Sequence, residues 1–415
     1  MKMRMVVLLG ALLSFTVVAC SSASGNGAVE QSGAAELHEL TLQELDDLLR
    51  GACIQATRGC AADGYIKRVH EAVEKGTKFT MVSPTAMPDD WTTVSPAGVG
   101  GGGAWEYVIE RTKKQEIPVV QNTQLKSIQL LEKHRGSKFN AVLRVEGAGA
   151  TLSALMAAAD LGVPVVDACL SQRARPEIQQ QISWLNGIPA TPAALVTRFG
   201  DEVVIQKATD DYRAEDLARA VAVSSGGGAS IAMNPMTADE VRRGTIPNAL
   251  SDAIKVGKTV REAREQGRDP IAALIEVTGG YKLFQGVVSK AESKGDRGFS
   301  WTDAELTGVG PYKGHKYRVF VKNENIVSWL DGKVDVASPD YIYNLNPKTG
   351  EAMTGGGLGG YEVGSEVAMV GVPAPSQWTT QAGIDVIGPR HFGFDFDYTP
   401  IAELQKKRAV QFSPQ

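Results

Sequence analysis

The chain has 415 residues, of which 43% are hydrophobic, and a formal net charge of -4 at pH 7. A chain of this length and composition can bury a large core, and its length predicts two domains. No run rich in lysine or arginine stands out, and the slightly acidic balance argues against nucleic acid as a partner.

The N-terminus has the pattern of an export signal. Lys2 and Arg4 precede residues 5–19, which carry no charge and are too few to span a bilayer. They lead into Cys20 in the pattern of a bacterial lipobox. We therefore predict a signal peptide over residues 1–19 and lipidation of Cys20, which would anchor the protein to a membrane. The alternative is a plain signal peptide followed by an incidental cysteine.

Residues 20–36 are rich in Gly, Ser and Ala and predict a flexible tether. Residue 21 is serine, without the aspartate that favours retention at the inner membrane of Gram-negative bacteria. We therefore expect an exported protein, lipid-anchored to the cell envelope. The outer membrane is favoured if the source is Gram-negative.

The first part of the body predicts two helices and a strand. Apolar residues recur at helical spacing over residues 37–54, where Thr41 and Glu44 are placed to form a capping box. A second helix is expected over 65–75 and a strand over 78–83.

A glycine-rich segment, residues 99–103, precedes a further helical stretch. Such a turn can bind an anion with its free backbone N–H groups, but it can equally be a flexible connection.

The clearest supersecondary pattern is a βαβ unit, with strands over 141–145 and 163–167 and a helix over 151–161. It predicts a parallel sheet, and ligands of such sheets collect beyond the carboxyl ends of the strands. Four candidate residues follow these strand ends: Glu146, Asp167, Cys169 and Arg173.

These candidates each allow two interpretations. Arg173 could lower the pKa of the Cys169 thiol and make it a nucleophile, but Cys169 could also be a buried structural residue or half of a disulfide. Glu146 could ligate a metal, act as a base or hold a substrate N–H, or it could cap the following helix. Asp167 has the same alternatives, with Arg173 as its nearest partner.

The rest of the chain changes from helices to short strands. Helices are expected over 215–223 and 236–265, the latter with Thr237 and Glu240 at capping-box spacing. Strands are expected over 317–321, 326–330, 333–336, 341–345 and 366–372. The domain division is therefore an α/β domain over 37–235, a helical connection over 236–271, a β-rich domain over 272–402 and a tail over 403–415.

Two polar segments of the second half could line a cleft. The first segment directly follows a strand, and its alternative interpretation is a simple turn. The second lies among aromatic residues, and its alternative interpretation is a C-terminal segment that seals the core. They contain Asn323, Glu324 and Asn325, and then Arg390, His391, Asp395 and Asp397.

The cysteines and histidines predict no preformed zinc site, because none is grouped in a metal-binding motif. Cys53, Cys60 and Cys169 follow Cys20, an odd number for an oxidising compartment. At least one thiol should be free or pair outside the chain.

Several segments together resemble the S-methyl thiohydantoin desulfurase family. They are VEGAGATLSALMAAADLGVPVVDACLSQRARPE, KNENIVSW, DGKVDVASPDYIYNLNPKTGEA and GPRHFGFDFDYTP. The resemblance covers roughly residues 40 to 400. It implies an α/β domain with a parallel sheet, a smaller β-rich C-terminal domain and a cleft between them. It also implies that water replaces a methylthio group on a small cyclic imide-like ring, with release of methanethiol.

The chain departs from the family pattern in two places. Arg58-Gly59-Cys60-Ala61 replaces a run of glycines, and Asp167-Ala168-Cys169 replaces Asp-x-Asp. Both changes put a cysteine near the expected cleft, so a Cys60–Cys169 disulfide is conceivable.

The resemblance also assigns roles to single residues. Asp167 and Glu324 are expected as bases or ligands, and Arg173 as the group that polarises or anchors the ring. With Cys169 these form the predicted catalytic set, and the predicted substrate-binding set is Glu146, Asn323, Asn325, Asp340 and Arg390.

The expected ligand is a small heterocycle. The sequence does not decide whether a divalent metal is bound, because it shows no clear ligand motif. Copies of the chain could associate as a homo-oligomer. The competing functions are a non-catalytic ligand-binding lipoprotein with a degenerate site and a structural lipoprotein with a filled cleft.

Overall fold

The structure is a computed structural model that describes residues 35–100 and 102–411. The predicted signal peptide, the lipidation site Cys20 and nearly all of the predicted tether lie outside the described residues. Within them, no helix is long and apolar enough to cross a membrane.

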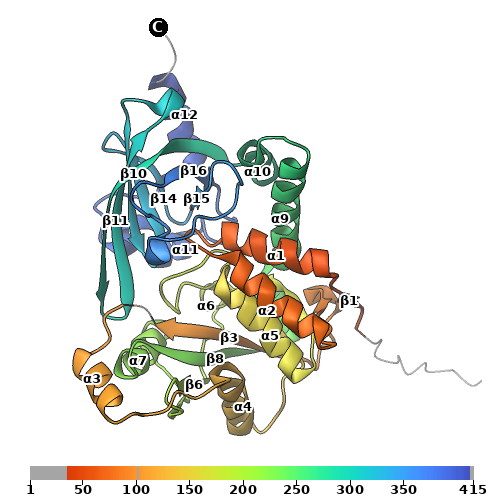
Figure 1. Ribbon diagram of the computed structural model, residues 1–415. Coiled ribbons are helices and arrows are strands. Elements are labelled where there is room, and N and C mark those ends of the chain that lie inside the picture. Colours follow the sequence, from red (N-terminus) through yellow and green to blue (C-terminus); the bar gives the residue numbers. More distant parts are fainter. Residues whose placement is uncertain (1–34, 101, 412–415) are drawn as a thin grey trace, which may run out of the picture. The chain divides into compact units, whose positions relative to one another are not determined.

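The first half of the body forms a nine-stranded mixed sheet in the order β1-β2-β5-β4-β3-β8-β6-β7, with β9 paired to β5 (Figure 1). The β3–β4, β4–β5 and β2–β5 pairs are parallel, which confirms the predicted βαβ unit of β4, α5 and β5. Its strands are β1 Leu37–Glu39, β2 Thr80–Val82, β3 Thr92–Gly100, β4 Ala141–Arg144, β5 Val165–Cys169, β6 Ala193–Thr197, β7 Glu202–Ile205, β8 Gly228–Thr237 and β9 Ile246–Pro247.

Helices cover both faces of this sheet. Val142 of β4 packs with one core cluster and Leu143 with another, so successive side chains face opposite layers. Because both faces are buried, most residues of β4 and β5 are apolar, and Arg144 and Asp167 are the exceptions. One layer holds α1 Leu42–Ile54, α2 Ala62–Glu74, α4 Thr123–Arg135, α5 Gly149–Leu161 and α9 Ala249–Glu265, and the other holds α7 Asp211–Ser224 and α8 Ala238–Gly244.

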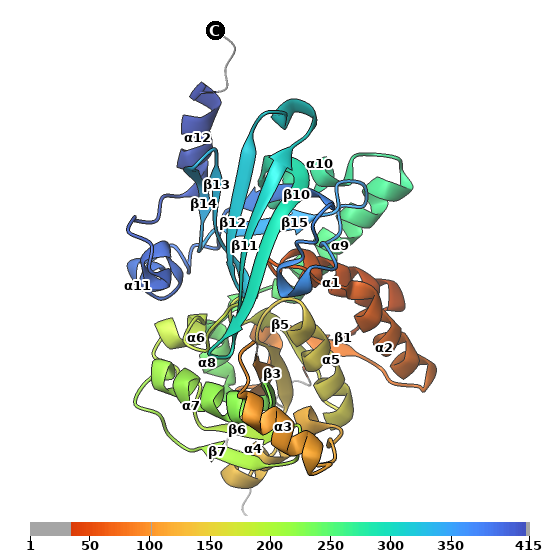
Figure 2. The same cartoon turned by 60° about the vertical axis from the view of Figure 1, so that its left-hand side comes forward.

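The second half forms a curled, seven-stranded antiparallel sheet in the order β14-β13-β12-β11-β10-β16-β15. Its two longest strands make a hairpin that extends toward α7 (Figure 2). The strands are β10 Tyr281–Asp296, β11 Phe299–Gly308, β12 Lys316–Lys322, β13 Glu324–Leu330, β14 Lys333–Ala337, β15 Tyr341–Leu345 and β16 Glu366–Val372. The remaining helices are α3 Glu106–Lys114, α6 Ile182–Leu185, α10 Pro270–Thr278, α11 Gln381–Ile387 and α12 Ile401–Gln411.

Both predicted capping boxes are present, but the helices that they begin differ from the prediction. Thr41 caps α1 with Glu44, while the residues before Thr41 form β1. Thr237 caps the short α8, and the expected helix over 236–265 breaks at β9 before α9 begins. Pro247 lies in that break and lacks the N–H that a continuing helix needs.

The glycine-rich segment serves close packing. β3 continues through Gly100, and Gly102 lies against the tip of the β10–β11 hairpin. A Cβ on Gly102 would stand 2.2 Å from Cα of Gly295, so only glycine allows the two backbones to approach this closely.

Candidate active site

A small cavity of about 130 Å³ lies at the carboxyl end of β4, lined by residues of both halves of the body. Glu146 and its neighbour Val145 directly follow β4, and Arg175 comes from the loop after β5. The second half contributes Asn323, which lies between β12 and β13, and Glu324, which is the first residue of β13. Glu146, a candidate from the strand-end rule, therefore lines a cavity, and the chain fold brings Glu324 to the same cavity.

Local geometry holds each carboxylate in place. Oε2 of Glu146 accepts a hydrogen bond from the backbone N–H of Arg175 at 2.9 Å. Asn323 has a φ of 57°, and its Oδ1 accepts a hydrogen bond from the Ser300 N–H at 2.8 Å. This turn places Glu324 at the cavity.

Glu324 lacks the hydrogen bonds that a buried carboxylate normally makes. Its side chain is 2% exposed, and the closest cation is Arg58, whose Nε lies 4.0 Å from Oε1. Among the described residues, Oε2 of Glu324 and Nε of Arg58 have no hydrogen-bond partner, and neither has Nε of Arg175. A buried polar atom without a partner is destabilising, so these three atoms are suited to bind a ligand.

The two carboxyl groups influence each other's titration. Burial raises the pKa of Glu324 to about 8; Arg58 opposes this rise, and the charge of Glu146 adds to it. Burial also raises the pKa of Glu146, and the guanidinium groups of Arg58 and Arg175 oppose that rise. At neutral pH, Glu324 is therefore mostly protonated and able to donate a proton.

The positive charge at the cavity comes from three arginines. Besides Arg58 and Arg175, Arg219 of α7 lines the wall and pairs with Glu215 at 2.7 Å. Its guanidinium also donates to the carbonyl oxygens of Gly100 and Gly298, which ties α7 to both sheets. The described residues contain no group of three or more His, Cys, Asp or Glu side chains that could hold a metal ion.

The predicted residues of the β5 end do not line this cavity. Asp167 accepts hydrogen bonds from the backbone N–H groups of Leu250 and Ser251, at 2.8 and 3.0 Å, and from the Ser251 hydroxyl. It therefore fixes the first turn of α9. Cys169 is fully buried, and its thiol donates to the Val145 carbonyl at 3.3 Å.

Arg173 is also fully buried and joins the two halves of the body. Its guanidinium donates to the Ser338 hydroxyl at 2.8 Å and to the carbonyl oxygens of Pro339 and Asn325. These contacts satisfy the charged group without a ligand.

Three predicted substrate-binding residues lie outside the cavity lining. The side chain of Asn325 bonds to the Ile342 carbonyl, to Asn344 and to Tyr361. Asp340 accepts hydrogen bonds from Tyr398 and from the N–H groups of Ala374 and Ile401. Arg390 is 59% exposed and pairs with Asp395 and Asp397 at the surface.

The conceivable Cys60–Cys169 disulfide is wrong. Cys53 pairs with Cys60, with 5.3 Å between their Cα atoms, and Cys169 is a free thiol. The bond closes the loop that follows α1, and this loop carries Arg58. The loop also contacts the second half, because the Cys60 N–H donates to the Met353 carbonyl at 2.9 Å.

A larger groove of about 860 Å³ adjoins the cavity and shares Glu177, Glu215 and Arg219 with it. At its inner end Glu177 pairs with Lys322 and, at 2.6 Å, with His391. Burial alone would raise the pKa of Glu177. The hydrogen bond from His391 and the charge of Lys322 outweigh burial and hold this pKa at about 2.

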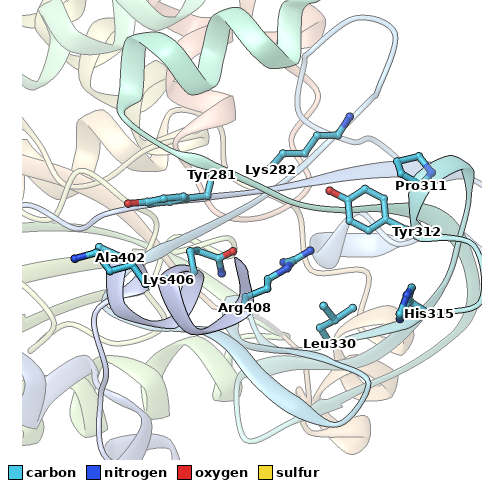
Figure 3. Close-up of a pocket in the computed structure, with 10 residues that line it drawn as sticks. Tyr281, Lys282, Pro311, Tyr312, His315, Leu330, Ala402, Lys406 and Arg408 are labelled. Atoms are coloured by element: carbon cyan, nitrogen blue, oxygen red, sulfur yellow. The ribbon is translucent and has the colours of Figure 1, made fainter. Parts of the chain in front are cut away.

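A separate hollow of about 770 Å³ lies between β10 and α12, where Tyr281 and Tyr312 face Lys406 and Arg408 (Figure 3). Arg408 is held by Asp335 and the Leu283 carbonyl. The buried Glu324 carboxylate, one oxygen of which has no hydrogen-bond partner, lies at the smaller cavity, so we take that cavity as the candidate active site.

Comparison with known proteins agrees with the resemblance found in the sequence. The family model "S-Me-THD-like, N-terminal domain" matches residues 43–207, and "S-Me-THD-like, C-terminal domain" matches residues 209–401. The chain belongs to the S-methyl thiohydantoin desulfurase family. The two models meet between β7 and α7, so the candidate site combines Glu146 of the first matched region with Glu324 of the second.

The fold is also similar to the X-ray crystal structure of a protein from Chromobacterium violaceum. The two share 20% sequence identity and a TM-score of 0.69, over 88% of this chain and all of the other. No curated protein matches the chain.

The sequence did not reveal the arginines of the site. Arg58 lies in the segment that, by the resemblance, replaces a run of glycines, and this departure is the one signal in the sequence that the loop differs here. Arg175 lies two residues after Arg173 in the same segment, but only the path of the loop decides which of them reaches the cavity.

Proposed function

We propose that this protein is a hydrolase that removes the methylthio group of a small S-methylated thiohydantoin ring. The observation that carries the proposal is the buried Glu324 carboxyl, which lines the cavity beside Glu146 with one oxygen lacking a partner. A cavity of about 130 Å³ suits a single small ring, because an engineered cavity of about 150 Å³ holds benzene.

The two glutamates suit the two proton transfers of this reaction. Glu146 takes a proton from water as the water oxygen bonds to the C=N carbon, while protonated Glu324 gives its proton to the ring nitrogen. The tetrahedral intermediate then loses its hydroxyl proton to Glu324 as the new C=O forms. The C–S bond breaks, and Glu146 protonates the departing methanethiolate. Both carboxyl groups return to their starting states.

The arginines can orient the ring. The Nε–H groups of Arg58 and Arg175 have no partner among the described residues, and each can donate to the carbonyl oxygen or to the developing negative charge. Preorganised donors of this kind stabilise a transition state without rearrangement.

The test is methanethiol release from a 2-methylthio-imidazolone, followed with a thiol-reactive dye. We expect turnover by the wild-type protein and by Glu362→Gln, an exposed control, but not by Glu324→Gln. Ligand binding without turnover in the wild type would refute the hydrolase and favour a non-catalytic binding protein.

We further propose that the protein is exported and lipid-anchored to the cell envelope through Cys20. The Cys53–Cys60 disulfide supports this, because such bonds persist in oxidising compartments. Labelling cells with a radioactive fatty acid tests it. The wild type and Cys169→Ala should carry label in the membrane fraction and Cys20→Ala should not, whereas an unlabelled wild type in the soluble fraction would contradict the proposal.

A further inference from the structure

The groove beside the cavity is large enough to hold much more than a five-membered ring. Its volume of about 860 Å³ compares with about 130 Å³ for the cavity. The two spaces share the side chains of Glu177, Glu215 and Arg219, so a ring in the cavity could carry a substituent that extends into the groove.

The charged residues of the groove are paired, most of them with one another and Asp216 with Arg213, which lies outside the groove lining. Glu215 pairs with Arg219 at 2.7 Å, and Arg297 lies 3.5 Å from its neighbour Asp296. Lys322 and His391 both bind Glu177. Because the charges are paired, the groove offers little attraction to a strongly charged substituent.

Aromatic rings from three separate elements line the same groove. Trp105 precedes α3 and is 46% exposed, and Tyr212 of α7 is 40% exposed. Phe299 and Trp301 of β11 are partly buried, with ring centroids 6.3 Å apart in an edge-to-face arrangement. Figure 2 shows that β10 and β11 reach from the second sheet toward α7, and residues of β11 and α7 line the same groove.

The rings of β11 are themselves held by cations. Lys322 Nζ lies 4.2 Å from the centroid of Phe299, and the Arg219 guanidinium lies 4.3 Å from it. Phe299 is therefore fixed between two paired charges and can support a ligand without reorganising. Trp105 and Tyr212 are the more exposed rings.

We propose that the groove binds an aromatic substituent of the substrate, so that the ring which enters the cavity derives from an aromatic amino acid. This rests on the proposed function for the assignment of the cavity to the ring. Paired aromatic rings contribute beyond their buried area, and a neutral planar group satisfies the groove without an unpaired charge.

The test compares two hydantoins, 5-benzylhydantoin and 5-methylhydantoin, which are reaction products of the proposed chemistry and bind whether or not turnover occurs. Calorimetry on the full chain should give a Kd for the benzyl compound at least about tenfold below that of the methyl compound. Trp105→Ala should remove most of this preference. Because Trp105 is exposed, its replacement is not expected to unfold the protein.

Trp301→Ala is the second variant, and Trp329→Ala is its matched control. Trp329 is a partly buried tryptophan of the same sheet that packs on Phe394 and does not line the groove. Trp329→Ala should therefore keep the preference for the benzyl compound, whereas Trp301→Ala should weaken it. Equal affinities for the two compounds, or no binding of either, would overturn the inference. Tight, selective binding of the benzyl compound without methanethiol release would instead overturn only the proposed reaction.

Discussion

Two carboxylates lie near the carboxyl ends of neighbouring parallel strands of the first sheet, and their surroundings differ. Asp167 lies within β5 and receives three hydrogen bonds from the start of α9. Glu146 follows β4 and accepts one hydrogen bond at the edge of a cavity, where it meets Glu324. The comparison teaches that position at a strand end selects candidates, whereas the surroundings of each carboxylate, a helix start or a cavity, separate the scaffold from the candidate site.

The largest effect is expected from Glu324→Gln. The amide keeps the shape of the side chain but cannot cycle a proton, so kcat/KM should fall by about 100- to 10,000-fold. Steady-state methanethiol release measures this, with Glu362→Gln as the control. Retention of more than about a tenth of the wild-type activity would exclude Glu324 as the acid.

The pH dependence should follow the same group. Glu324 must be protonated, and its pKa is about 8, so kcat/KM should fall about tenfold per pH unit above pH 8. Glu146 must be ionised to act as the base, so kcat/KM should also fall at acidic pH, where Glu146 becomes protonated.

Stability should change in the same direction with pH. The folded protein keeps the Glu324 proton up to about pH 8, whereas the unfolded chain releases it near pH 4.5. The free energy of unfolding should therefore decrease as the pH rises from 4.5 to 8. Thermal melts of Glu324→Gln should lack this part of the decline.

Removal of the disulfide should have an intermediate effect. In Cys53→Ser/Cys60→Ser the loop that carries Arg58 is no longer closed, so kcat/KM should fall by about 10- to 100-fold. The unfolding free energy should fall by about 2 kcal/mol. A reductant should reproduce these losses in the wild type and leave the double variant unchanged. Equal activity of the variant and the wild type would show that Arg58 does not depend on the bond.

Asp167 should matter for stability rather than for catalysis. Asp167→Ala leaves N–H groups of α9 without an acceptor and should lower the unfolding free energy by about 2 kcal/mol, and Asp167→Asn by less. Turnover well below the melting temperature should stay within about threefold of the wild type in both variants. Loss of turnover in a folded Asp167→Asn protein would restore the catalytic role that the sequence predicts.

The smallest effect is expected from Arg390→Ala. Arg390 pairs with Asp395 and Asp397 at the surface, where solvent screens the charges. Neither turnover nor the melting temperature should change measurably. A raised KM would place this segment in contact with the substrate after all.

The sequence predicts the parallel unit and the five short strands of the second sheet, because their apolar patterns are local. It predicts no strand for β3, β6, β7, β8, β10 or β11. β8 contains Asn234 and Pro235, and exposed polar residues in the outer part of the β10–β11 hairpin carry no alternation. Both segments are strands because of the neighbours with which they pair, which a local pattern does not contain.

For the candidate site, the sequence indicates single residues but not which of them lie together. Glu146 follows from the strand-end rule and Glu324 from the family resemblance, but nothing local brings them together. Arg173 and Arg175 show the limit most clearly. They lie two residues apart in one loop, yet the first ends among carbonyl oxygens and the second beside the cavity.

The order of strands in the first sheet also bears on how such proteins could be shortened or recombined. The N-terminal family match stops at residue 207, whereas β8, which lies between β3 and β6, comes later in the chain. A fragment cut at that boundary would lack an internal strand and expose two long edges. The two matched regions are thus not exchangeable modules, and recombination between relatives should succeed only where the crossover keeps β8 with the sheet that it completes.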